Sequence, residues 1–313
     1  MSFNALIIDV DTGVDDAVAL AFAIAKGTNL VGVTTVAGNV SIDVATRNTL
    51  DVLAYLGRED IPVHRGSSRP LVADYEDARD VHGANGLGGM ELAPSSTPQA
   101  VLAGPAFIIQ CADRFAGELD LVAVGPLTNL AIALNVRPRI VQQIRRLVVM
   151  GGAYFVPGNK VPDAEFNVYV DPDAAHQVFN ANWNDITLVG LDVTHQAVLS
   201  RELWASIPDD AAGAAGLVRG VTRRTFSERG KSGFYLHDPL AVAVALEPDL
   251  VRGTHFAVNV ESIGVARGRT SPTPRNSGPM IATEVDAERF VGDLSQVLGL
   301  PVVDVGAGFD NAE

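Results

Sequence analysis

Cysteine is nearly absent from this sequence: Cys111 is the only one among 313 residues. A single cysteine cannot form an internal disulfide, and it cannot build a thiolate site for structural zinc or for an iron–sulfur cluster. Any metal ion that binds here must therefore use oxygen or histidine ligands.

Long apolar runs are absent as well. The longest, such as residues 17–25 and 240–246, are far shorter than the roughly 18 residues that cross a bilayer. The first residues lead straight into a strand pattern without the basic region of a secretory signal. We therefore expect a cytoplasmic protein with no membrane partner.

Positive charge is scarce relative to negative charge. The chain has 23 Lys and Arg residues against 37 Asp and Glu residues, which gives a formal net charge of −14. This balance repels a phosphate backbone and leaves no basic stripe for nucleic acid. We expect no nucleic-acid partner and a small substrate that is neutral or cationic.

Hydrophobic residues make up 47% of the chain, which is enough for a large core. Strand-like apolar runs alternate with helix-like runs, as is typical of βαβ units. The sequence predicts an α/β fold with an open, mostly parallel β-sheet flanked by helices, in a single domain over residues 1–313. In such sheets ligands bind beyond the carboxyl ends of the strands. The expected strands are 5–8, 30–36, 62–64, 121–124, 147–150, 186–191 and 256–260, the first helices are 15–25 and 41–56, and 83–98 and 267–279 are expected loops.

Four carboxylates follow the first expected strand within eight positions: Asp9, Asp11, Asp15 and Asp16. Gly13 supplies a turn, and Asp15 and Asp16 open an apolar helix, whose dipole favours negative charge. Helix capping and solvated loop residues are the ordinary alternative. Four acidic groups against apolar walls nevertheless repel one another unless a cation intervenes, and oxygen ligands favour calcium or magnesium over zinc.

A second candidate is His237-Asp238-Pro239, which precedes an apolar helical run. Helix capping explains Asp238 and Pro239 well, because both are common at helix starts. The adjacent histidine favours chemistry, since His237 could act as an acid beside a metal-bound carboxylate.

Amide and acid side chains gather further along the chain. Asn159, Glu165 and Asn167 suit hydrogen bonding to a polyhydroxylated ligand, although turn formation explains Asn159 equally well. The backbone carbonyl of Val124, at a tight strand-to-helix turn, could ligate a metal.

A glycine-rich segment begins at His82 and resembles a loop that covers a ligand. It lacks the lysine of a phosphate-binding loop and the glycine spacing of a dinucleotide fingerprint. A Gly-x-Ser-x-Gly elbow is also absent, which weighs against a serine nucleophile.

Together these segments resemble the inosine–uridine preferring nucleoside hydrolases. The similarity begins at Asp9-Val-Asp11-Thr-Gly13-Val-Asp15-Asp16 and extends over essentially the whole chain. The further blocks, in the family's order, are Ala37-Gly38-Asn39, His82-Gly83-Ala84-Asn85-Gly86-Leu87-Gly88, Gly125-Pro126-Leu127-Thr128-Asn129, Met150-Gly151-Gly152, Ala164-Glu165-Phe166-Asn167 and His237-Asp238-Pro239.

The resemblance implies calcium-dependent hydrolysis of the N-glycosidic bond of a ribonucleoside, with inversion at the anomeric carbon. It gives Asp11 as the base that activates a metal-bound water. His237 is the candidate acid for the leaving base, although family members differ in how they activate the base. The implied calcium ligands are Asp11, Asp16, Asp238 and the carbonyl of Val124. The implied substrate-binding residues are Asp15, Asn39, His82, Asn159, Glu165, Phe166 and Asn167.

Specificity and assembly are less defined by the resemblance. By position, His82, Phe226 and Tyr235 could line the base pocket, although aromatic residues at such spacings more often belong to a core. Uridine, cytidine and inosine all stay possible. A 5′-phosphate is disfavoured because the matched positions provide no lysine or arginine. The family implies a homodimer or a homotetramer.

The sequence departs from the family pattern in two places. Thr12 stands where the family often has proline, and the segment after Gly268 diverges from the usual continuation.

Two other functions stay open. One is a haloacid dehalogenase-like phosphatase, with Asp9 as nucleophile and Asp11 as acid. The other is a non-catalytic nucleoside-binding protein. Release of free ribose would discriminate against the non-catalytic alternative.

Overall fold

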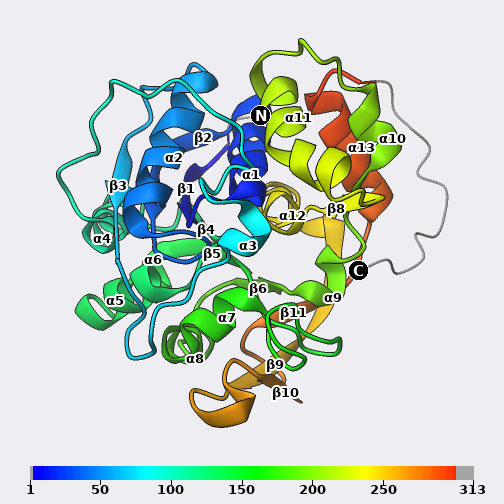
Figure 1. Ribbon diagram of the computed structural model, residues 1–313. Helices are drawn as coiled ribbons and strands as arrows, with labels where there is room; N and C mark the ends of the chain where they lie inside the picture. Colours follow the sequence, from blue (N-terminus) through cyan, green and yellow to red (C-terminus); the bar gives the residue numbers. More distant parts are fainter. Residues whose placement is uncertain (1–2, 301–313) are drawn as a thin grey trace.

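The computed structural model describes residues 3–300, in which strands and helices alternate from β1 onward (Figure 1). The strands are β1 Ala5–Val10, β2 Asn29–Thr35, β3 Val63–Arg65, β4 Leu119–Ala123, β5 Ile144–Met150, β6 Ile186–Val189, β7 Val198–Ser200, β8 Gly233–Tyr235, β9 Val251–Val260, β10 Thr270–Pro274 and β11 Met280–Val285. The α-helices are α1 Val14–Ala25, α2 Ile42–Tyr55, α3 Arg79–His82, α4 Gly104–Arg114, α5 Thr128–Val136, α6 Ile140–Gln143, α7 Phe166–Val170, α8 Pro172–Phe179, α9 Leu191–Thr194, α10 Arg201–Ser206, α11 Gly213–Arg223, α12 His237–Leu246 and α13 Ala287–Val297. A π-helical turn, η1, covers Arg224–Glu228, and the 3₁₀ turns η2 and η3 cover Pro248–Leu250 and Gly264–Ala266.

The main sheet has nine strands in the order β10-β9-β11-β6-β5-β4-β1-β2-β3. All neighbouring pairs from β11 to β3 are parallel, and β9 is antiparallel to both β11 and β10. Helices cover both faces of this sheet (Figure 1). The predicted α/β class with a mostly parallel open sheet is therefore confirmed.

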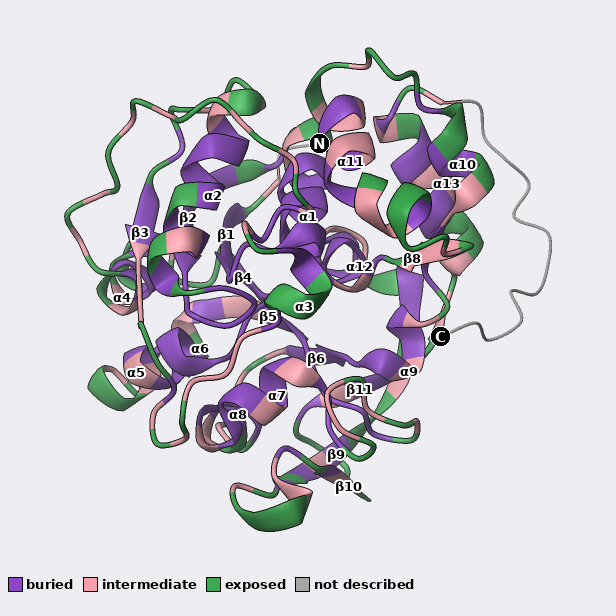
Figure 2. Ribbon diagram, in the orientation of Figure 1, coloured by how far each residue is buried: buried purple, intermediate pink, exposed green. Residues whose placement is uncertain are grey.

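Side chains at alternate positions of β1 pack into two hydrophobic cores, one on each face of the sheet. Leu6, Ile8 and Val10 pack into the core shared with α1, α11, α12 and α13. Ala5 and Ile7 point the other way, into the core shared with α4, α5 and α8. Because side chains alternate across a strand, a strand with apolar residues at every position belongs in the middle of a covered sheet. Figure 2 shows this interior as continuously buried ribbon.

The predicted loop 267–279 is partly wrong, because it contains strand β10. This strand pairs with β9 in antiparallel register, with Pro272 opposite Val258 and Pro274 opposite Phe256. Proline cannot donate a ladder hydrogen bond, so prolines predict a loop; at the edge of a sheet, where β10 lies, they are tolerated. The other predicted loop, 83–98, contains no helix or strand.

The carboxyl ends of β1, β2, β4, β5 and β6 lie along one edge of the sheet, because these strands are parallel neighbours. The segments that follow them hold most of the polar residues singled out above. The fold therefore brings together residues that lie far apart in the chain.

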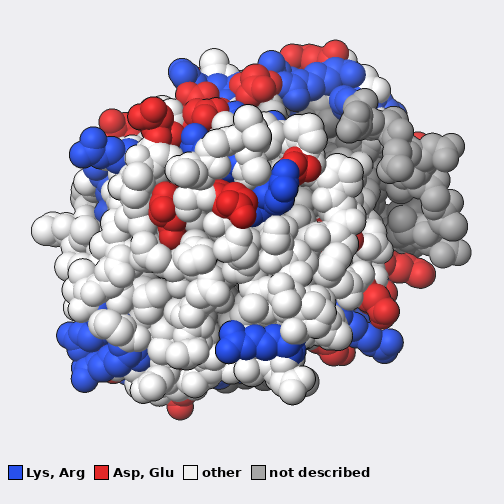
Figure 3. Space-filling model, turned by 90° about the horizontal axis from the view of Figure 1, so that it is seen from below, with Lys and Arg blue, Asp and Glu red and all other residues white. Residues whose placement is uncertain are grey.

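Charged residues are dispersed on the face seen in Figure 3. Lys and Arg groups lie apart from one another there, mixed with Asp and Glu around a broad area of other residues. On this face no basic stripe is formed.

Among residues 3–300, no helix is both long enough and apolar enough to span a bilayer.

Candidate active site

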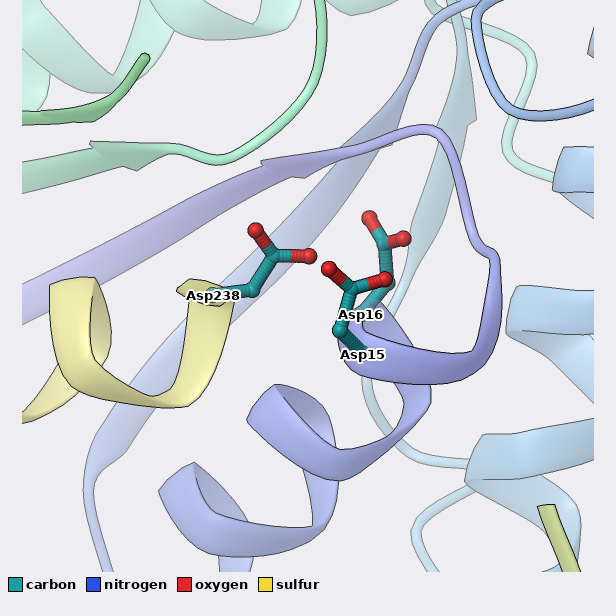
Figure 4. A group of neighbouring side chains, drawn as sticks. All are labelled: Asp15, Asp16 and Asp238. Atoms are coloured by element: carbon teal, nitrogen blue, oxygen red, sulfur yellow. The ribbon is translucent and has the colours of Figure 1, made fainter. Parts of the chain in front are cut away.

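Three carboxylates converge at the carboxyl edge of the sheet. Asp15 and Asp16 lie in the first turn of α1, and Asp238 is the second residue of α12. One oxygen from each lies within 4.8 Å of the others. Figure 4 shows their side chains pointing toward one another from the two helix starts. The capping alternative for Asp238 is not what the structure shows, because α12 has no side-chain cap and Asp238 lies inside the helix.

Asp11 lies beside this group and is fully buried, but it is outside the set of three. Its Oδ2 accepts a hydrogen bond of 2.6 Å from the backbone N–H of Asn39. Its Oδ1 is buried without a hydrogen-bond partner among the described residues. Asp11 therefore has one anchored oxygen and one free oxygen.

Asp16 is held in place by the turn that precedes α1. Its Oδ1 accepts from the backbone N–H of Asp11 at 3.0 Å, and its Oδ2 accepts from the N–H of Gly13 at 2.8 Å. The side-chain amide of Asn39 donates to the same Oδ2 at 3.1 Å. The Thr12 hydroxyl lies 2.7 Å from that of Thr49 on α2, so Thr12 ties this turn to a helix.

Asp9 does not join the cluster. Its Oδ1 accepts hydrogen bonds from the Asn129 amide and from the Thr34 hydroxyl, on neighbouring parts of the fold. Burial raises its pKa to about 7. Its hydrogen bonds build Asp9 into the interior between β1, β2 and α5, and they do not point it at the carboxylate cluster.

The buried carboxylates of the cluster resist ionisation. Burial raises the pKa of Asp11, and the charges of Asp16 and Asp15 raise it further. The pKa of Asp238 is raised well above its usual value by burial and then by Asp15, Asp16, Asp11 and Glu165. Among the described residues, no lysine or arginine forms a salt bridge with Asp11, Asp15, Asp16 or Asp238.

These residues fit a divalent cation. A positive ion offsets the repulsion that raises the pKa values, since an opposite charge favours the ionised carboxylates. The Oδ1 atoms of Asp11 and Asp15 are buried without partners in the part of the chain that the structure describes, so each is available to an ion or to another ligand. All the donors are oxygens, which suits a hard cation.

A cavity of about 420 Å³ opens onto this cluster. Its size lies in the usual range for small-molecule sites. Each substrate-binding residue expected from the sequence lies on its wall, together with Val124, Asp238, His237 and Tyr235. The expected set on the wall is Asp15, Asn39, His82, Asn159, Glu165, Phe166 and Asn167. Asp11 and Asp16 are not part of this wall, but both accept hydrogen bonds from Asn39, which is.

One wall of the cavity is organised by Glu165, the N-cap of α7. Its carboxylate accepts from the backbone N–H groups of Gly152, Asn167 and Val168 at 3.0, 2.8 and 3.1 Å. Asn159 Oδ1 accepts from the N–H of Phe166 at 2.9 Å. These bonds leave the Asn159 amide nitrogen and the remaining lone pairs of Glu165 for a ligand.

The side chain of Asn167 lies between two backbone carbonyl groups, at the carboxyl ends of β4 and β5. Its amide nitrogen donates to the carbonyl of Val124 at 2.7 Å and to that of Met150 at 3.3 Å. The carbonyl of Val124 keeps one lone pair, so it can still ligate a metal. The arrangement also fixes the orientation of the Asn167 amide, whose oxygen is left for a ligand.

Two histidines line the cavity. His82 accepts a hydrogen bond at Nδ1 from the backbone N–H of Val14 at 3.1 Å, and burial lowers its pKa to about 4. Burial lowers the pKa of His237 to about 3, with smaller contributions from His195 and His82. Both rings are therefore neutral near pH 7. His237 can donate a hydrogen bond in that state.

The structure separates the two aromatic residues expected in the base pocket. Tyr235 lines the cavity, but Phe226 does not. Phe226 is 1% exposed and stacks on Trp204 with 4.9 Å between the ring centroids. Phe226 therefore follows the ordinary alternative, because buried aromatic residues at such spacings usually belong to a core.

Part of the cavity wall comes from residues outside the motifs of the sequence. The additional residues are Val14, Ala78, Asp80, Val81, Met150, Lys160, Thr225, Arg229, Lys231 and Phe234. Three of these are cations that come from positions outside the matched motifs. The cavity wall therefore contains cations, although the matched motif positions provide none. Lys160 is paired with Glu76 at 3.2 Å, and Arg229 donates to the carbonyl of Asp80.

The family model described as inosine-uridine preferring nucleoside hydrolase matches residues 6–292. The chain belongs to this family. Uridine nucleosidase 1 of Arabidopsis thaliana is 37% identical to it over 85% of this chain and 80% of that protein. Non-specific ribonucleoside hydrolase RihC of Klebsiella pneumoniae is 37% identical over 94% of this chain and 98% of that protein. The solved structure of a plant nucleoside hydrolase matches with a TM-score of 0.89 at 32% identity, over 95% of this chain and 99% of the other.

These comparisons confirm the family, the enzyme class and the fold expected from the sequence. The phosphatase alternative loses its basis, because the match covers the whole site and Asp9 is built into the core. The nucleoside hydrolase fold places the acidic cluster at the bottom of a polar cavity in this chain.

Proposed function

We propose that this nucleoside hydrolase cleaves the N-glycosidic bond of pyrimidine ribonucleosides or inosine, releases free base and ribose, and depends on calcium. The observation that carries the proposal is the group of buried carboxylates without a salt-bridged lysine or arginine among the described residues, at the bottom of a polar cavity. The names of the relatives, which include a uridine nucleosidase and a non-specific ribonucleoside hydrolase, support the substrate class.

Asp11, Asp16, Asp238 and the carbonyl of Val124 would hold the ion. A bound calcium ion supplies Lewis-acid polarisation and orients water near the carboxylates. The all-oxygen donor set supports calcium over zinc. Asp15 has an unpartnered oxygen and lines the cavity, so it is placed to accept a hydrogen bond from a ribose hydroxyl.

Asp11 is the proposed general base. Its Oδ2 is anchored by Asn39, which leaves Oδ1 to take a proton from the attacking water. The water oxygen forms a bond to the anomeric carbon as the C–N bond breaks, so direct attack inverts that carbon. The electron pair of the broken bond leaves with the base. The base then takes a proton from solvent, and Asp11 releases to solvent the proton that it took from the attacking water.

The ribose becomes positively charged in the transition state, and the cavity suits that charge. Glu165, Asp15 and Asp238 are carboxyl groups on its wall, and a bound cation favours their ionised forms. Negative groups placed where positive charge develops stabilise an oxocarbenium-like transition state. Asn39, Asn159 and Asn167 provide amides for the ribose hydroxyls. His82, Tyr235 and His237 surround the space for the base.

Ribose release from uridine, cytidine, inosine, adenosine and uridine monophosphate tests the proposal directly. We expect release from nucleosides in the presence of calcium, and the order of rates gives the preferred base. The nucleotide shows whether the cations of the wall admit a phosphate. A calcium-loaded protein that binds nucleosides and releases no ribose would instead be a nucleoside-binding protein.

The predicted homodimer or homotetramer stays a prediction, which light scattering would test.

A methyl group at residue 38 would collide with the proposed base. A Cβ built on Gly38 lies 2.1 Å from Oδ2 of Asp11 and 2.7 Å from Cδ of Pro126. We expect Gly38→Ala to lower kcat by about tenfold or more, because small misplacements of reacting groups are costly. Gly292→Ala in α13 is the matched control, since nothing lies within 4 Å of its Cβ. Steady-state kinetics would contradict the assignment if the two variants had equal kcat.

A further inference from the structure

Thr194, the last residue of α9, contacts the ring of His237. Its Oγ1 lies 2.7 Å from Nδ1 of that ring, and Thr194 has no exposed surface. A backbone hydrogen bond of 2.8 Å from the N–H of Leu236 to the carbonyl of Ala197 ties the same two segments together. The position of Thr194 relative to His237 is therefore fixed by two contacts.

The direction of the Thr194 hydrogen bond follows from counting hydrogens. Within residues 3–300, His237 is the only hydrogen-bond partner of the Thr194 hydroxyl. If Nδ1 carried a hydrogen and donated it, the buried hydroxyl hydrogen would have no acceptor, which is costly. The hydroxyl therefore donates to Nδ1. The hydrogen of the imidazole is then on Nε2.

We propose that Thr194 is a positioning residue that holds His237 as the Nε2–H tautomer, so that this N–H donates a hydrogen bond to the departing nucleobase. The inference deepens the proposed function and rests on it. His237 lines the cavity, and Nδ1 is occupied by Thr194, so Nε2 is the nitrogen left for a ligand. His195 and Tyr235 pack against the ring, with centroids 5.8 and 5.6 Å from that of His237, and limit its rotation.

The hydrogen bond acts on the electron pair that the base retains when the C–N bond breaks. A donor aimed at the base stabilises the negative charge that develops there. No protonated imidazole is needed. A leaving group that is already a stable anion gains little from such a donor. The benefit should therefore depend on the leaving group and not on the ribose.

The tautomer can be measured without catalysis. Long-range ¹H–¹⁵N correlation spectra of the calcium-loaded full chain, labelled with ¹⁵N-histidine, distinguish Nε2–H from Nδ1–H rings. The His237 signals are assigned by their loss in His237→Gln. We expect Nε2–H for His237 in the wild type, and a mixture of tautomers in Thr194→Val. An Nδ1–H ring in the wild type would overturn the inference.

Kinetics on two substrates separate positioning from general structural damage. We expect Thr194→Val to lower kcat for uridine or inosine by about 10- to 100-fold, within the usual contribution of a positioned proton donor. Hydrolysis of 4-nitrophenyl β-D-ribofuranoside, whose leaving group is a stable anion, should change little. Thr194→Ser, which retains the hydroxyl, should restore most of the rate on nucleosides.

Thr28→Val is the matched control, because Thr28 is also buried and its hydroxyl has no partner among the described residues. Equal losses on both substrates, or no loss on nucleosides, would show that Thr194 does not position a donor. A wild type that releases no ribose from either substrate would refute the proposed function instead. The tautomer measurement would still decide the role of Thr194 in that case.

Discussion

Asp11→Asn is expected to lower kcat for ribonucleoside hydrolysis by about 10²- to 10⁴-fold, the usual contribution of a general base. The asparagine has nearly the same shape and retains one oxygen in place of the Oδ2 that accepts from Asn39. It cannot take a proton from water. KM should change much less than kcat, because the substrate contacts on the cavity wall remain.

Asp120→Asn is the matched control for the Asp11 variant. Asp120 is also a buried carboxylate, but it lies near the start of β4 and pairs with Arg145. We expect this control to lower the melting temperature and leave kcat close to the wild-type value. The base assignment fails if Asp11→Asn retains kcat within about tenfold of wild type. A calcium-dependent rise in melting temperature in Asp11→Asn would separate loss of the base from loss of the ion.

Removal of calcium should have an effect of similar size. Lewis-acid polarisation supplies several kcal/mol, so chelation is expected to lower kcat by roughly 100- to 1000-fold, with recovery when calcium is added. The ion should also stabilise the fold, because it offsets repulsion among Asp11, Asp15, Asp16 and Asp238. Calcium at 100 times its Kd would raise the free energy of unfolding by about 2.7 kcal/mol.

Asp238→Asn tests where the ion binds. We expect this variant to lose most of the calcium-dependent rise in melting temperature, together with activity. Asp43→Asn is the control, since Asp43 is an exposed carboxylate that pairs with Arg65 on the surface. Thermal unfolding with and without calcium gives the comparison. A full calcium effect in Asp238→Asn would exclude this residue as a ligand, and activation by magnesium or manganese alone would identify a different ion.

The sequence predicted the sheet well where the signal was local. The apolar run of β1 and the apolar helix α1 are each encoded by consecutive residues, and both appear within a few positions of their expected bounds. The segment around β10 was predicted as a loop because its prolines oppose a strand. Only pairing with β9 at the sheet edge makes that strand possible.

The site was predictable to the extent that its motifs are short. Asp11, Asp15 and Asp16 lie within six positions, so one turn brings them close whatever the rest of the chain does. Asp238 was a candidate from its neighbours His237 and Pro239 alone. That its carboxylate meets those of Asp15 and Asp16 depends on the packing of α12 against α1, which no local pattern encodes.

By itself, the sequence determined the alternation of strands and helices, the acidic segment after the first strand and the family of the chain, because each depends on residues close together or on motifs in a fixed order. Only the tertiary structure decided which side chains share the cavity. It buried Phe226 against Trp204, brought Lys160 and Arg229 to the wall, and set Thr194 against His237. Such contacts join residues from separate segments, and their distances depend on how whole helices pack against the sheet.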